Sequence, residues 1–303
     1  MKYKLLAASL MAIFFFFSLS QKTIGQEKRE GKINWVEEYI SAIGEGTATP
    51  SGNKVKDQLR AVRAATILAQ RTLLETVKEL KIDSQTKVQN KMLQEDVINT
   101  RIEGTIQGAE IVKQNVRWEG DTPIATVELR ICLGGLGGCK SEKSLINALN
   151  LDQKSEQTNA PSQRLDDIVI KQETTVQKNQ DIVYDSSRPV TGLIFNLQGI
   201  FFERVILPVV ITISDGNKPF TVYSVKSVEP QVIRTYGVVR YADSVEQARQ
   251  NPHLGDNVII VPVSGITKEN MIVIGFDAAR LIRETTSHGN DYFKNAKVSI
   301  AAK

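Results

Sequence analysis

Both cysteines of the chain lie in a glycine-rich stretch whose residue types suit several kinds of chemistry. The sequence ICLGGLGGCK, residues 131–140, contains Cys132, Cys139 and four glycines, and it is followed by Ser141. A phosphate-binding loop requires a glycine, four residues and then Gly-Lys-Ser/Thr. Cys139 separates Gly138 from Lys140, so the spacing excludes this loop.

A zinc site at the same stretch lacks ligands. Tetrahedral zinc needs about four side chains, and the only histidines, His253 and His288, are far along the chain. Two cysteines in an exported chain are expected to oxidise, and the glycines between them turn readily. We therefore expect a Cys132–Cys139 disulfide that closes a loop at the end of a strand, with free thiols as the alternative. The sequence indicates no metal and no cofactor.

Export itself is predicted from the N-terminus. Lys2 and Lys4 precede an apolar run, residues 5–19, and small residues at Ser18 and Ser20 would suit cleavage before Gln21. This pattern is typical of a secretory signal peptide over residues 1–20, with a second cleavage point near Gly25. An uncleaved anchor is the alternative, but the run is shorter than the roughly 20 residues that span a bilayer. No cysteine lies near the junction to carry lipid.

Composition and charge restrict the class of protein. Hydrophobic residues make up 41% and charged residues 24% of the 303 residues, as in ordinary globular proteins. The formal net charge of +4 becomes +2 without the two leader lysines, so we expect no nucleic-acid partner. No apolar segment after the leader is long enough to predict a transmembrane span. The expected location is the periplasm or the outer membrane.

The first domain, predicted for residues 31–150, combines strands with one long helix. A strand over 35–47 is followed by Asn53, which we expect to cap a helix over 54–81. A polar segment and a short apolar stretch, residues 95–106, lead into strands over 109–118 and 124–132, joined as a hairpin by the turn at 119–123. The predicted core face of the helix contains Val55, Leu59, Val62, Thr66, Ala69, Leu73, Val77 and Leu80. This pattern predicts an antiparallel sheet of at least three strands covered by one amphipathic helix.

Residues 151–188 are predicted to form a polar linker with a short element over 165–171. The second domain, 189–303, is predicted to be a β-rich mixed module, which makes the whole chain α+β. Strands are expected over 191–200, 205–214, 220–225, 231–242, 257–263, 271–276 and 297–301. Short helices are expected over 245–250, capped by Ser244, and over 277–284, and a hairpin turn over 215–217.

Isolated polar and aromatic residues suggest no catalytic group. A histidine without a nearby nucleophile and carboxylate does not define a triad, so His253 and His288 are interpreted as loop residues. Asp277 is expected in the first turn of its helix, and Ser264-Gly265 lacks the preceding glycine of a nucleophile elbow. The other candidates are interpreted as solvated charges or packing residues: Asp166, Asp167, Asp181, Asp185, Arg60, Arg63, Arg71, Trp35, Trp118, Phe201 and Phe202.

The order of motifs in the first domain resembles a known family. Gly44 and Gly46 end a strand, an A-x-R-A-A helix follows at 61–65, and G-x-I-x-x-A-E-I at 104–111 leads into the hairpin. This order over residues 38–132 resembles the Lpp-twenty family of bacterial surface lipoproteins and the related N-terminal domain of the flagellar ring protein FlgT. The absence of a lipid-carrying cysteine departs from the lipoprotein members.

The second domain is similar to a module found downstream of such domains in exported proteins. Where related sequences have G-L-[IV]-[IV]-D-A-R-G, this chain has Asn196 and Gln198 in place of the Asp and Arg. The resemblance implies a non-enzymatic structural or assembly protein of the cell envelope, with a flagellar role among those that relatives serve. Its expected partners are envelope proteins or further copies of itself. A soluble periplasmic ligand-binding module is the alternative, and a hydrolase of envelope material is less favoured because no local motif supports it.

Overall fold

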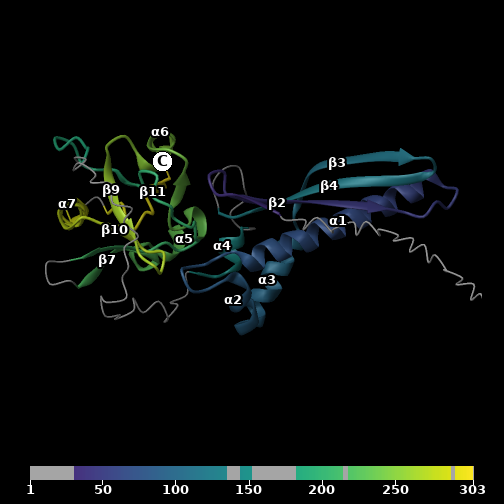
Figure 1. Ribbon diagram of the computed structural model, residues 1–303, viewed down its shortest axis with the longest axis horizontal. Helices are drawn as coiled ribbons and strands as arrows, with labels where there is room; N and C mark the ends of the chain where they lie inside the picture. The colour runs from purple at the N-terminus through teal and green to yellow at the C-terminus, as the bar shows by residue number, and fades with distance from the viewer. Residues whose placement is uncertain (1–30, 135–143, 152–181, 214–217, 288–290, 303) are drawn as a thin grey trace, which may run out of the picture.

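The computed structural model describes residues 31–134, 144–151, 182–213, 218–287 and 291–302. They form two groups of elements, one around each of two sheets, that lie end to end along the long axis of the molecule (Figure 1). The fold is α+β, as predicted. The leader, the short element predicted over 165–171 and the hairpin turn over 215–217 lie outside the described residues.

The N-terminal sheet is antiparallel, with the strand order β1-β2-β4-β3. Its strands are β1 (Lys32–Asn34), β2 (Tyr39–Thr47), β3 (Glu110–Glu119) and β4 (Thr122–Cys132). The predicted hairpin is confirmed: Glu119 lies opposite Thr122 across a two-residue turn in which Gly120 has φ 59°. The strand expected from residue 35 begins only at Tyr39, because residues 35–38 turn the chain from β1 into β2.

Helix α1 (Lys54–Glu79) begins at the predicted cap, where the Asn53 side chain accepts a hydrogen bond from the backbone of Lys56. The helix covers β2 and β4 at very short range. A Cβ atom added to Gly44 would lie 2.0 Å from the carbonyl oxygen of Ala65, and one added to Gly46 would lie 2.3 Å from the Ala65 nitrogen. Glycine on the strand and alanine on the helix are therefore both required for this contact.

The predicted core face of α1 is partly wrong. Val55 and Leu59 are 70% and 65% exposed, whereas the buried stripe contains Asp57, Ala61, Ala65, Ala69, Thr72, Leu73 and Val77. The close approach of the helix to the glycines of β2 explains the difference. Because the strand has no side chains there, small residues rather than large apolar ones fit beneath the helix.

Three short helices complete the N-terminal part. The polar segment over residues 83–94 contains α2 (Val88–Gln94), and α3 (Asp96–Gln107) buries Ile98, Ile102 and Ile106. Helix α4 (Leu145–Ala148) is capped by Ser144 and contacts both α3 and α5. Figure 1 shows α4 where the two parts of the molecule meet.

The C-terminal sheet is mixed and has the order β7-β6-β10-β9-β5-β11-β8. Its strands are β5 (Gly192–Asn196), β6 (Val210–Ile213), β7 (Pro219–Tyr223), β8 (Arg240–Ala242), β9 (Val258–Ile266), β10 (Ile272–Ile274) and β11 (Val298–Ala301). The pairs of β5 with β9 and β11, of β11 with β8, and of β6 with β10 are parallel, and the other two pairs are antiparallel.

Helices flank this sheet largely where the sequence predicts them. Helix α6 (Val245–Arg249) is capped by Ser244, and α7 (Phe276–Ser287) follows β10; the 3-10 turns η3 (Val225–Ser227) and η4 (Pro252–Leu254) complete the described elements. The prediction over 231–242, a strand pair or one long bent strand, is wrong for its first half and right for its end, where β8 lies. The first half is α5 (Pro230–Tyr236), because Pro230 begins a helix that Gly237, with φ 73°, ends.

One contiguous cluster of buried apolar side chains includes residues of both sheets and of the short helix between them. The two parts are therefore packed together. In the described part of the chain, no helix has both the length and the apolar character needed to cross a bilayer.

Candidate functional site at the domain junction

The junction is built around the turn that precedes β2. Glu38 adopts a left-handed backbone conformation, φ 55°, and its carbonyl oxygen accepts a hydrogen bond of 2.7 Å from the backbone of Leu133. Its carboxylate lies against Gly134, where an added Cβ atom would come within 2.4 Å of Oε2. The start of the glycine-rich loop is thus in contact with Glu38.

Arg240, the first residue of β8, reaches Glu38 from the second domain. The Arg240 Nη1 atom forms an ion pair with Glu38 Oε1, and only 10% and 8% of the two side chains are exposed. Burial lowers the pKa of Arg240, while the charge of Glu38 opposes this effect. Among the described residues, no hydrogen-bond acceptor reaches Nε or Nη2 of Arg240. The guanidinium therefore depends strongly on Glu38 for compensation of its charge.

An aromatic contact lies beside this ion pair. The ring of Tyr241 meets Trp35 of the first domain edge-on, with centroids 5.3 Å apart. The Tyr241 hydroxyl donates a hydrogen bond of 2.7 Å to the carbonyl of Val205 and accepts one from the Val205 nitrogen. Burial raises the pKa of Tyr241 well above its usual range, so the hydroxyl keeps its proton at all physiological pH values.

Backbone hydrogen bonds also join the domains. The nitrogens of Ile206 and Leu207 donate to the carbonyls of Lys81 and Ile82, at 3.1 and 2.7 Å. The Lys81 ammonium group lies 2.6 Å from the carboxylate of Glu203. The segment after α1 is therefore held to the second domain by main-chain bonds that do not depend on side-chain identity.

The small hollow at the junction has a mostly apolar lining. It is formed by Trp35, Glu38, Leu133, Ile146, Val205, Ile206, Val238, Val239 and Tyr241. Its one carboxylate is already engaged by Arg240, and the Tyr241 hydroxyl is engaged by Val205. Such a lining offers a polar ligand few groups to bind, so its chemistry suits a fixed contact between domains better than a binding pocket.

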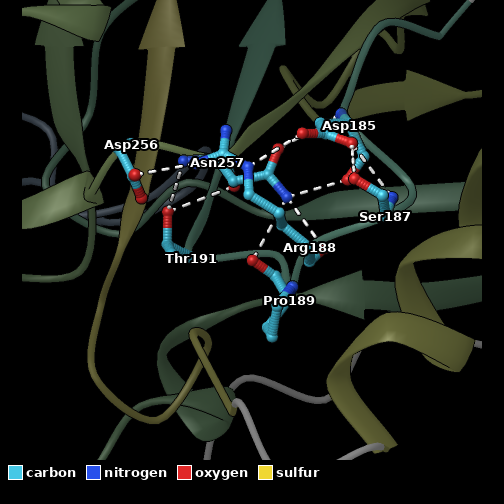
Figure 2. Close-up of polar contacts among 7 residues, drawn as sticks. All are labelled: Asp185, Ser187, Arg188, Pro189, Thr191, Asp256 and Asn257. Carbon is cyan, nitrogen blue, oxygen red and sulfur yellow. Dashed lines mark hydrogen bonds and ion pairs between the residues drawn. The ribbon is translucent and has the colours of Figure 1, made fainter.

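A second polar cluster fixes the beginning of the C-terminal domain (Figure 2). Asn257 is 3% exposed, and its side-chain amide donates to the carbonyls of Asp185, Arg188 and Pro189 at 2.9–3.2 Å. The side-chain oxygen Oδ1 of Asn257 accepts a hydrogen bond of 3.2 Å from the backbone nitrogen of Asp185. One buried side chain thus holds the turn that leads into β5.

Charged groups close the exposed side of this cluster. Arg188 lies 2.8 Å from Asp185 and 2.9 Å from Asp256. Hydrogen bonds from the Ser187 hydroxyl, from Arg188 and from the Ser187 backbone lower the pKa of Asp185 to about 2. The interpretation of Asp185 as a solvated linker charge is therefore incomplete, because its carboxylate organises the turn.

The other sequence candidates are not brought together. His253 lies in η4, where Nε2 is 2.7 Å from the carbonyl of Asn295 and the ring stacks on Tyr236; burial lowers its pKa. Asp277 is in the first turn of α7, as expected, and pairs with Arg280.

The aromatic pair and the arginines also have separate environments. Phe202 is buried but Phe201 is 84% exposed, so the expectation that both belong to the core is half wrong.

The remaining candidates lie apart from one another. Three of them lie on the solvent side of α1: Arg60, Arg63 and Arg71. Trp118 is half-buried near Lys54, and Ser264 is exposed on β9. Asn196 accepts a hydrogen bond from the backbone of Gln198.

Several candidates lie beyond the described residues: His288, Asp166, Asp167, Asp181 and Cys139. Cys132 ends β4, at the rim of the sheet beside Glu38 and Leu133. The Cys132–Cys139 disulfide remains a prediction. Within the described part of the chain, no group of three or more His, Cys, Asp or Glu side chains is arranged to hold a metal ion.

Sequence reasoning missed the Glu38–Arg240 pair. A signal was present, because Arg240 interrupts the apolar run YGVVRYA and a charge within such a run requires a partner when it is buried. The identity of the partner could not be read, because Glu38 is in the other domain and has a neighbouring glutamate, Glu37, of equal chemistry.

Two family models match separate parts of the chain. Residues 29–130 match the LPP20 lipoprotein family. Residues 192–303 match the family described as the second domain of Treponema pallidum Tp0624. A search of curated proteins found no match. The LPP20 match agrees with an exported, envelope-associated protein, as expected from the leader. The chain is therefore similar to the LPP20 lipoprotein family in its N-terminal part and to the second domain of Tp0624 in its C-terminal part.

Proposed function

We propose that this protein is a non-enzymatic structural or assembly component of the bacterial cell envelope. The observation that carries the proposal is the junction, where a buried ion pair, an aromatic contact and two backbone hydrogen bonds hold the two modules in one arrangement. A fixed arrangement suits a protein that presents two surfaces at a set spacing to other components.

The junction also weakens the alternative of a periplasmic ligand-binding module. Binding proteins that close around a ligand need a hinge and a pocket with convergent polar groups. The hollow between these domains is small and mostly apolar, and its carboxylate and its phenol hydroxyl are engaged by Arg240 and Val205. We therefore favour assembly over ligand capture, with the periplasm or the outer membrane as the location.

The test is a pull-down of the mature protein from gently solubilised envelopes, with bound proteins identified by mass spectrometry. We expect envelope proteins to be recovered, and basal-body ring proteins among them would place the role in the flagellum. A matched variant, Glu38→Gln, weakens the junction and should reduce recovery, whereas the surface variant Lys56→Glu should not. Recovery of the protein alone, from a soluble periplasmic fraction, would contradict the proposal.

A further inference from the structure

Strand β3 is an uncovered edge of the N-terminal sheet. It pairs with β4 on one side and is the last strand in the sheet order, and Figure 1 shows it along the upper edge of the N-terminal sheet. Its first six residues, 110–115, are all exposed, and in the described part of the chain no strand pairs with its outer side. A ten-residue edge of this kind presents unpaired backbone groups for another strand.

The hairpin turn determines which backbone groups point outward. In a hairpin with a two-residue turn, the closing pair, here Glu119 and Thr122, exchanges hydrogen bonds, and the pattern then alternates along the ladder. Trp118, Val116 and Gln114 are therefore in the pairs that do not exchange backbone hydrogen bonds with β4. Their N–H and C=O groups therefore point away from β4, towards the free edge.

We propose that β3 pairs antiparallel with β3 of a second copy of this chain, in a register centred on Val116. The two sheets then become continuous across a two-fold axis. In this register Lys113 lies opposite Glu119 of the other copy, and Asn115 lies opposite Arg117. The inference rests on the proposed assembly role, for which it supplies the first contact.

The charges on β3 favour this register over registers that are shifted by one or two residues. A shift of two residues in one direction places Lys113 opposite Arg117, and a shift in the other direction places Arg117 opposite its own copy. Like charges directly opposite are destabilising, whereas opposite charges stabilise a strand pair. A shift of one residue would place side chains of different faces opposite each other.

The same pattern favours a second copy over an unrelated strand. A two-fold interface requires that if residue i contacts residue j, then j also contacts i. Lys113 with Glu119 meets this requirement, and each pair occurs twice in the interface. On the face that carries α1, Val116 meets its own copy, and its half-buried side chain would become covered.

The first test is sedimentation equilibrium of the full mature protein over a range of concentrations, for the wild type and for Val116→Pro. Proline is tolerated at an edge position whose N–H does not bond the neighbouring strand, so the fold should persist, as checked by circular dichroism. We expect a wild-type dimer and a monomeric variant. A wild-type monomer at all concentrations, or a dimer that Val116→Pro leaves intact, would overturn the proposal.

The second test examines the register. Lys113→Glu and Glu119→Lys each place like charges opposite each other and should raise the dimer dissociation constant about tenfold, because each change acts twice. The double variant restores opposite charges and should return the constant towards the wild-type value, and Lys56→Glu, outside β3, is the charge control. Val116→Cys should form a disulfide with its own copy on mild oxidation, and Asn115→Cys should do so much less. Equal effects in the single and double variants would overturn the register.

The outcomes separate this inference from the proposed function. A monomer that still captures envelope proteins through β3, with capture lost in Val116→Pro, would show that the edge serves another partner and would overturn self-pairing alone. A dimer that captures no envelope protein would support the inference and contradict the proposed function.

Discussion

Replacement of Glu38 by glutamine should reduce the free energy of unfolding by about 3–5 kcal/mol, the usual effect of removing one partner from a buried ion pair. The substitution keeps the size of the side chain and one acceptor oxygen but leaves the Arg240 guanidinium without a counter-charge. Because only 10% of the Arg240 side chain is exposed, water compensates little of this loss. Among the described residues, its Nε and Nη2 atoms have no acceptor that could take over the role of Glu38.

A double-mutant cycle measures the interaction directly. We expect Arg240→Met to be destabilising as well, and the double variant Glu38→Gln/Arg240→Met to lose far less than the sum of the two single losses. Buried ion pairs replaced on both sides are often close to neutral in stability. Urea unfolding in a Trp118→Phe background isolates the fluorescence of Trp35, which contacts Tyr241 across the junction.

The matched control is the exposed pair of Lys81 and Glu203 at the same junction, with side chains 31% and 47% exposed. Replacement of both by alanine should change stability by no more than about 1 kcal/mol, because surface ion pairs contribute little. If Glu38→Gln cost no more than this control, or if the two single losses simply added, burial of the Glu38–Arg240 pair would not be what stabilises the junction.

Three further predictions concern packing, pH and oxidation. Gly44→Ala should destabilise the protein by about 3 kcal/mol or more, because the added Cβ atom would lie 2.0 Å from the backbone of α1; Gly104→Ala, with open space and a helical position, should be neutral or stabilising in the same urea titration. The folded-state pKa of Asp185 is about 2, below the ordinary value of 3.8, so its ionised carboxylate contributes fully above pH ~5, and the contribution is lost as the pH falls towards 2. An NMR titration of the 185–189 turn should follow this loss, and Asp185→Asn should abolish it. A Cys132–Cys139 disulfide should appear as a mass difference of about two hydrogens on reduction, and reduction should lower stability by roughly 2–3 kcal/mol; free thiols in the exported protein would contradict the expectation.

Local signals in the sequence predict the elements of the first domain well. Asn53 caps α1 as its position indicates, and Gly120 lies in the turn of the β3–β4 hairpin. Helix caps and hairpin turns are formed by residues only a few positions apart, so they can be predicted without knowledge of the tertiary structure. The α5 segment was misread because its apolar residues fit a short strand as well as a short helix, and Pro230 and Gly237 decide the matter.

The face of α1 illustrates what periodicity alone does not decide. Val55 and Leu59 continue an apolar stripe in the sequence, yet the helix turns its alanines towards the sheet. The glycines of β2 allow the helix backbone to approach so closely that only small residues fit. The choice depends on two elements fitting each other, and neither element contains that information by itself.

Composition and interactions between near neighbours along the chain are enough to predict the α+β class, the order of the two modules, export, and the local helix and hairpin signals. The tertiary structure alone decided that Arg240 pairs with Glu38, that Asn257 holds the entry to the second domain, and that β3 is left as a free edge. These features join residues that are distant in sequence, and the free energy of burying a charge or leaving a strand unpaired depends on where the rest of the chain lies.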